Sequence, residues 1–174
     1  MDVEIFLTDL VNQIILLETD KRNYELYKES RVDEILSTFE FKYLSDFTLY
    51  AAQLGNLKIF KKLMDHGFML NEFCLRDSIE RKKFGLAQFI LRENLISLKP
   101  RDMNYFAANK DLCSISFAFY HGCPWGSNTL LVCAKHGCYK TFHFCFENGA
   151  PVDEFLVSYV KKMKDKRFQQ LLRC

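Results

Sequence analysis

Two stretches of the sequence share a frame that predicts the fold: residues 51–68, AAQLGNLKIFKKLMDHGF, and residues 133–151, CAKHGCYKTFHFCFENGAP. When Ala52 is aligned with Ala134, four further positions are identical. They are Gly55 with Gly137, Lys58 with Lys140, Phe60 with Phe142, and Gly67 with Gly149. Identical glycines at both ends of the stretch, with a Phe between them, indicate an internal repeat, which is the signature of a stacked architecture.

The same frame recurs in less regular form along the chain. Its small or apolar anchor residue is predicted at Ala52, Ile79, Ala108, Ala134 and Val160. The intervals between these anchors are 27, 29, 26 and 26 residues, and the copy at Ala108 is one residue short. We therefore expect five units, and their predicted ranges are 46–70, 71–98, 99–125, 126–152 and 153–174.

Each unit is predicted to be a helix-turn-helix. The first helix ends near the anchor, where a small side chain lets a neighbouring helix approach closely. The second helix carries apolar residues at helical spacing, as Leu57, Phe60 and Leu63 do in the first copy. A left-handed residue then ends the unit. The residues predicted for this role are Gly67, Asn94, Gly122 and Gly149. Because one helix pair cannot bury its apolar stripe alone, neighbouring pairs must stack.

The pattern AAxxGxLxxxxxLxxxG, followed by Gly122-Cys123-Pro124-Trp125, resembles the ankyrin-like repeats of large double-stranded DNA viruses of protists. The resemblance covers residues 46–174 and implies an all-α fold, a helical solenoid of stacked helix-turn-helix repeats. The units lack the Thr-Pro-Leu-His stretch and are shorter than the ankyrin type of about 33 residues, so simple turns are expected instead of hairpin fingers. The family implies protein binding, with no shared catalytic residues.

Residues 1–45 precede the predicted array. Ile5, Leu10, Ile14 and Leu17 lie near one face of a predicted helix. We expect this segment to be an N-terminal cap or a degenerate repeat that covers the first unit, as solenoids require. The alternative is a divergent F-box-like segment, because residues 7–14 (LTDLVNQI) loosely resemble the opening helix of that motif. The resemblance to viral ankyrin proteins implies that such a segment would recruit a ubiquitin ligase, but the usual Pro and Trp are missing.

Composition narrows the class of protein. The chain has 174 residues, 49% of them hydrophobic, which is enough for a packed core. A net charge of +2 does not by itself indicate nucleic acid or membrane as a partner. No segment reaches the ~20 apolar residues of a membrane span. Seven cysteines without a secretory signal lead us to expect reduced thiols in a cytosolic or nuclear compartment. The resemblance to viral repeat proteins implies that this compartment is the cytoplasm or nucleus of a host, or a virion.

Groups that could carry chemistry form no recognisable site. The His and Cys residues that fall within 25 positions are His121, Cys123, Cys133, His136, Cys138, His143 and Cys145. No CxxC pair, the usual sign of zinc, occurs among them, so we expect core and loop roles and no metal. Neither a nucleophile with its base and orienting acid nor a phosphate-binding glycine loop is apparent. We predict no catalytic residues, no cofactor and no small-molecule substrate.

The predicted binding surface is a basic ridge. The two positions that follow each anchor lie at the exposed end of the first helix in ankyrin-like arrays, and positive charge at these positions increases along the chain. The ridge is predicted to contain Arg81, Lys82, Lys110, Lys135, Lys161 and Lys162. We expect it to attract an acidic surface of a partner protein, with an ordinary solvated rim as the alternative.

Trp125 is the only tryptophan and lies between two predicted units. We expect it to hold adjacent repeats together by packing. The alternative is an anchor for a ligand, because Trp is enriched at binding hot spots.

Two functions follow from these observations. The first is a non-catalytic adaptor that binds a host protein through the concave face of the solenoid. The second is a structural or virion-associated assembly protein that packs against other subunits, which exposed aromatic side chains would favour.

Overall fold

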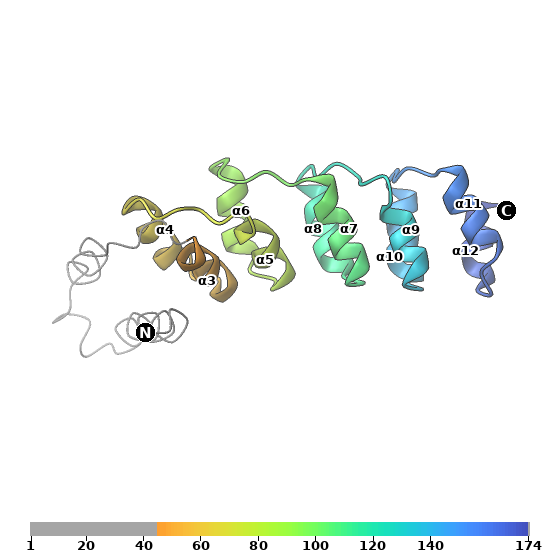
Figure 1. The fold of residues 1–174 in the computed structure, drawn as a ribbon, viewed down its shortest axis with the longest axis horizontal. Helices are drawn as coiled ribbons and strands as arrows, with labels where there is room; N and C mark the ends of the chain where they lie inside the picture. Colours follow the sequence, from red (N-terminus) through yellow and green to blue (C-terminus); the bar gives the residue numbers. More distant parts are fainter. Residues whose placement is uncertain (1–44, 174) are drawn as a thin grey trace. The chain divides into compact units, whose positions relative to one another are not determined.

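A computed structural model describes residues 45–173, and over this range the chain is helical and contains no strand (Figure 1). The all-α class is therefore confirmed for the described residues. The expectations for the N-terminal segment, a cap or an F-box-like helix, concern residues that lie outside this range apart from Ser45. The chain divides into two compact units between Cys74 and Leu75.

The first unit contributes the helices α3 (Asp46–Leu54) and α4 (Leu57–Asp65), which pack against each other. Their contact buries the small side chain of Ala52 and the ring of Phe60 completely. Helix α4 begins after Asn56, whose side-chain oxygen accepts a hydrogen bond of 3.1 Å from the backbone amide of Ile59. This bond satisfies one of the amides that the first helical turn leaves without a partner.

The second unit is a succession of helix pairs. Its helices are α5 (Cys74–Glu80), α6 (Phe84–Arg92), α7 (Pro100–Ala108), α8 (Leu112–Tyr120), α9 (Thr129–Lys135), α10 (Tyr139–Glu147), α11 (Glu154–Lys161) and α12 (Lys166–Leu172). Helix α7 packs on α8, α9 on α10, and α11 on α12. In addition, α9 contacts both α7 and α11, and α10 contacts both α8 and α12. From α7 onward, the first helices of successive pairs (α7, α9 and α11) therefore contact one another, and so do the second helices (α8, α10 and α12).

The core of the second unit lies between these two layers of helices. Small or β-branched residues near the ends of the first helices are almost fully buried, as at Ile79, Ala134 and Val160. Large rings fill the space between second helices: Phe142 of α10 meets Phe168 of α12 with ring centroids 4.9 Å apart. Complete burial of such a side chain contributes about 1.5–3 kcal/mol.

The predicted closing residues all have left-handed backbone conformations, which confirms this part of the sequence analysis. Their φ angles are 78° at Gly67, 53° at Asn94, 79° at Gly122 and 81° at Gly149. In each case the next amide donates a hydrogen bond of 3.0 Å to the carbonyl five residues earlier. Such a bond is the mark of a Schellman motif, which satisfies carbonyls that the helix end would otherwise leave free.

The anchor that we predicted at Ala108 is wrong by one residue. Ala107 is fully buried, whereas Ala108 is half-buried. The left-handed residue Lys110 lies three positions after Ala107. The same interval separates Ala52 from Gly55, Ile79 from Lys82, and Ala134 from Gly137. With Ala107 as the anchor, every closing residue follows its anchor by the same 15 positions. Two adjacent alanines made the sequence frame ambiguous here, and burial decides between them.

The last helix pair closes its turn in a different way. Residues 161–165 contain no left-handed residue. Instead, the side-chain amide of Gln169 in α12 donates to the carbonyls of Val160, Lys161 and Met163 at 3.3, 3.1 and 3.0 Å. A side chain of the second helix thus satisfies the carbonyls at the end of the first.

Gly122 and Gly85 provide a matched test of the closing conformation. A Cβ atom at either glycine would meet no heavy atom within 4 Å, but only Gly122 has a left-handed φ. We expect Gly122→Ala to lower the free energy of unfolding by about 1–2 kcal/mol. Gly85→Ala, inside α6, should raise it by about 0.5–1 kcal/mol. Urea denaturation measures both changes, and a Gly122→Ala variant as stable as the wild type would contradict the assignment.

Candidate protein-binding surface

The residues of the predicted basic ridge lie in and beside the turns within helix pairs, but not at one repeated position. Lys135 and Lys161 are the last residues of α9 and α11. Lys82 and Lys110 are the left-handed residues of their turns, with φ angles of 61° and 58°. The other two, Arg81 and Lys162, take an intermediate position, second after the anchor. The six residues therefore occupy three different positions of the turns, and the misplaced anchor at Ala108 accounts for the position of Lys110.

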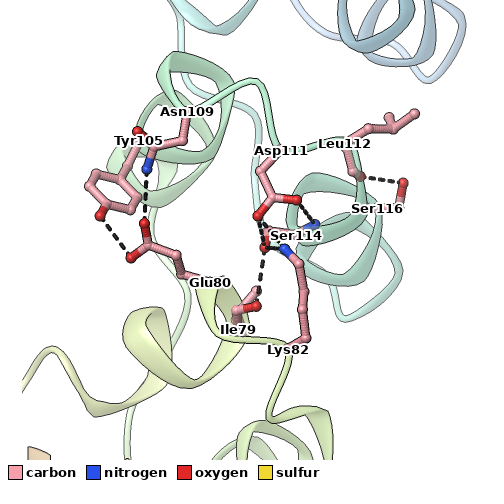
Figure 2. A network of polar contacts seen from close by, with 9 residues as sticks. All are labelled: Ile79, Glu80, Lys82, Tyr105, Asn109, Asp111, Leu112, Ser114 and Ser116. Carbon is pink, nitrogen blue, oxygen red and sulfur yellow. Dashed lines mark hydrogen bonds and ion pairs between the residues drawn. The ribbon is translucent and has the colours of Figure 1, made fainter. Parts of the chain in front are cut away.

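All six side chains are exposed, but Lys82 already has partners within the chain. Its ammonium group forms an ion pair with the carboxylate of Asp111 and donates a hydrogen bond of 2.8 Å to Oγ of Ser114 (Figure 2). Since Asp111 and Ser114 lie at the start of α8, Lys82 links the turn after α5 to the next helix pair. The remaining five side chains make no ion pair or hydrogen bond within residues 45–173.

A second polar link joins the same two helix pairs. The carboxylate of Glu80 accepts hydrogen bonds from the hydroxyl of Tyr105 at 2.8 Å and from the side-chain amide of Asn109 at 3.1 Å (Figure 2). The guanidinium of Arg76 lies over the ring of Tyr105, 4.5 Å from its centre. Burial and the hydrogen bond to Glu80 raise the pKa of Tyr105, so its hydroxyl remains a donor at neutral pH.

Asp111 has two structural roles in this network. One oxygen accepts a hydrogen bond of 3.1 Å from the amide of Ser114 and so caps α8, and the other faces Lys82. Burial acts to raise the pKa of this carboxyl group, but the hydrogen bonds from Lys82 and Ser114 outweigh it and hold the pKa below the ordinary 3.8. The folded state therefore favours the charged carboxylate.

The loop after Gly122 connects two helix pairs. Nε1 of Trp125 donates a hydrogen bond of 2.9 Å to the carbonyl of Asn148 at the end of α10. The Trp125 ring also stacks on Phe119 of α8, with centroids 5.2 Å apart. Gly126 lies so close to α7 that a Cβ atom there would be 2.7 Å from the carbonyl oxygen of Pro100. These contacts match the packing role that we expected for Trp125.

An exposed aromatic cluster lies beside this loop, and the sequence analysis did not identify it. Tyr120 is 73% exposed and contacts the rings of Phe119 and Phe144 edge-on, at centroid distances of 5.4 and 6.5 Å. Helix α8 has the apolar sequence LCSISFAFY, so hydrophobic periodicity could not separate its buried residues from its exposed ones.

The buried cysteines have the surroundings of core residues. Cys133 and Cys145 are both fully buried, and the proximity of Cys145 together with burial raises the pKa of Cys133. Burial, with a smaller effect from Asp102, raises the pKa of Cys123 to about 12. The thiols of Cys123 and Cys133 are therefore protonated at neutral pH. Within the described residues, no group of three or more His, Cys, Asp or Glu side chains is placed to hold a metal ion.

Comparisons with protein-family models, with curated proteins and with solved structures found no match for the chain. Over residues 45–173, every helix falls short of the length and apolar character that a membrane span requires.

Asp111→Asn separates the ion pair from the helix cap. Asn retains a side-chain oxygen for the amide of Ser114, but it loses the charge that faces Lys82. We expect the variant to be less stable by about 0.5–1 kcal/mol at pH 7, because the Lys82 side chain is 41% exposed and solvent screens the pair. Since folding lowers the pKa of Asp111, the stability difference between wild type and variant should be complete above pH 3.8. It should vanish as the pH falls through the pKa that Asp111 has in the folded state.

Urea denaturation of wild type and Asp111→Asn at a series of pH values measures this dependence. A stability difference that persists unchanged into strong acid would show that the charge of Asp111 is not its cause.

Trp125→Phe tests the packing role of the loop. Phe retains a ring against Phe119 but loses the hydrogen bond to Asn148, so the free energy of unfolding should fall by about 0.5–1.5 kcal/mol. Unfolding is followed by circular dichroism, because the variant contains no tryptophan. A variant that keeps wild-type stability but loses a bound partner protein would instead identify Trp125 as a ligand anchor.

Proposed function

We propose that this chain is a helical solenoid of ankyrin-like helix-turn-helix repeats that binds another protein without catalysing a reaction. The contacts of α9 with both α7 and α11, and of α10 with both α8 and α12, support a stacked repeat. The constant interval of 15 residues between anchor and closing residue supports a common unit. Repeats of this kind offer an extended surface for binding a protein.

The observation that carries the binding role is the set of exposed cations in the turns. Arg81, Lys110, Lys135, Lys161 and Lys162 come from four successive helix pairs and have no partner within residues 45–173. A charged surface without internal partners favours association with a complementary surface, mainly by increasing the association rate and the specificity. By its resemblance to repeats of large DNA viruses, the proposed partner is a host protein in the cytoplasm or nucleus.

Affinity purification of the tagged full-length chain from cells, with light scattering on the same material, tests this proposal. We expect a monomer that retains one defined protein, which rebinds when both components are purified. A ubiquitin ligase subunit as that partner would support the F-box-like alternative for residues 7–14. A chain that retains no protein under any of these conditions would contradict the adaptor role.

The second candidate function is assembly with copies of the same chain or with other subunits. The exposed aromatic residues Tyr120, at 73%, and Phe155, at 62%, favour it, because such side chains commonly mark association surfaces. If this function is correct, light scattering should show concentration-dependent self-association that Tyr120→Lys and Phe155→Lys reduce. A wild-type chain that stays monomeric at high concentration would exclude assembly with itself.

A further inference from the structure

The turns within the helix pairs of the second unit differ in charge from the loops between the pairs. We refer to the four turns together as the turn edge, which consists of residues 81–83, 109–111, 135–138 and 161–165. The turn edge contains eight Lys or Arg residues and two carboxylates, Asp111 and Asp165. The loops between pairs, residues 93–99, 121–128 and 148–153, contain only Lys99 against Glu93 and Asp153. Within this unit the turns lie at one end of the helix pairs and the loops at the other (Figure 1).

Both carboxylates of the turn edge are already paired. Asp111 binds Lys82, and Asp165 accepts a hydrogen bond of 2.7 Å from the guanidinium of Arg167. The cations that remain exposed and make no ion pair or hydrogen bond within residues 45–173 are Arg81, Lys83, Lys110, Lys135, Lys161, Lys162 and Lys164. The turn edge therefore carries a net positive charge that no ion pair within residues 45–173 balances, and such a charge favours association with an anion.

A comparison of Lys82 with Lys110 shows why one lysine is used internally and the other is not. Lys82 and Lys110 occupy the same position in successive helix pairs, because each is the left-handed residue of its turn. Lys82 forms an ion pair because, in the next helix pair, the cap residue of the second helix, α8, is Asp111. Asp111 lies three residues before Ser114 and accepts a hydrogen bond from its hydroxyl. In the helix pair that follows Lys110, the equivalent position is occupied by Cys138, which lies three residues before Thr141. Sγ of Cys138 is 2.9 Å from Oγ1 of Thr141. The geometry is preserved, but the carboxylate is replaced by a thiol.

The spacing of the turns indicates the form of the anion. Packed helices lie about 8–10 Å apart, so cations of successive turns recur at about that interval. An extended polypeptide rises about 3.3 Å per residue, so a carboxylate at about every third residue would meet each turn. A nucleic acid strand carries a phosphate about every 3.4 Å along its axis, which is a denser array. The turn edge also contains no Phe, Tyr or Trp on which bases could stack.

We propose that the turn edge binds an extended acidic polypeptide segment of the partner, with carboxylates about three residues apart facing successive turns. This inference rests on the proposed function, because it describes how the partner protein is held. It also replaces the general expectation of an acidic surface with a specific geometry.

The test uses the full-length chain and a fluorescein-labelled 12-residue peptide, (Glu-Ser-Ser)4, in fluorescence anisotropy. Three variants are compared with the wild type. Lys110→Glu/Lys135→Glu reverses two charges of the turn edge. Arg92→Glu/Lys99→Glu makes the same change in net charge at the opposite end of the pairs, at the last residue of α6 and in the loop that follows it. Cys138→Asp restores the carboxylate that would pair with Lys110, and circular dichroism confirms that each variant is folded.

We expect the wild type to bind the peptide, and the Lys110→Glu/Lys135→Glu variant to bind it about tenfold or more weakly, since each reversal replaces an attraction with a repulsion. The Arg92→Glu/Lys99→Glu variant should bind the peptide within about twofold of the wild type. Its changed charges lie at the other end of the helix pairs, and salt screens charges that are more than a Debye length from the peptide. Cys138→Asp should be more stable to urea than the wild type and should bind the peptide several-fold more weakly.

Three results would overturn the inference. The first is equal weakening by the turn-edge and loop variants, which would indicate an effect of net charge alone. The second is equal binding of an isomeric peptide with its four Glu residues clustered, which would exclude the spacing. The third is tighter binding of a 12-nucleotide DNA strand or of phosphatidylserine vesicles, which would assign the turn edge to another class of anion.

The partner protein distinguishes this inference from the proposed function. If a purified partner binds the wild type and the Lys110→Glu/Lys135→Glu variant equally well, the chain is a protein-binding module that uses a different surface, and the turn-edge inference is wrong. If no partner protein is found, the proposed function itself fails, whatever the peptide does.

Discussion

Each helix of residues 45–173 is seven to nine residues long, and this length constrains everything else in the structure. Isolated helices shorter than about 12–15 residues are marginal in water, so the stability of these helices must come from their neighbours. In the second unit each helix pair from α7 onward contacts the pair beside it through both layers. Two kinds of buried side chain contribute to this packing. They are the anchors, such as Ala134, and the rings between second helices, such as Phe142 against Phe168.

The helix ends matter as much as the core, because short helices have a large share of unpaired backbone groups. Here one solution recurs: a left-handed residue followed by an amide that bonds to the carbonyl five residues earlier. The solution does not require glycine, since Asn94, Lys82 and Lys110 adopt the same conformation. Helix α11 reaches the same result with the side chain of Gln169. Different side chains thus satisfy one backbone requirement.

The features that could be predicted from the sequence are local ones. The closing residues were identified because glycine and asparagine tolerate left-handed backbone conformations and recur at fixed intervals. The anchor at Ala107 was missed because its neighbour Ala108 is identical in size, and only burial separates them. The link between Lys82 and Asp111 joins residues 29 apart, so it depends on how helix pairs stack, which no local pattern contains. The exposure of Tyr120 was missed for a related reason, since its apolar helix has no polar face to mark the direction of solvent.

From α7 to α12, the most extensive contacts between helices lie within a pair or between adjacent pairs, and this has a mechanical consequence. If the two ends of the second unit were pulled apart, α11 and α12 could separate without breaking any contact between α7 and α8. Extension under load would then proceed as a series of small steps, one helix pair at a time, instead of a single cooperative rupture. The links that span two pairs, Lys82 with Asp111 and Trp125 with Asn148, would determine which steps resist the most. Such a chain would act as an extensible connector whose compliance is set by a few side chains.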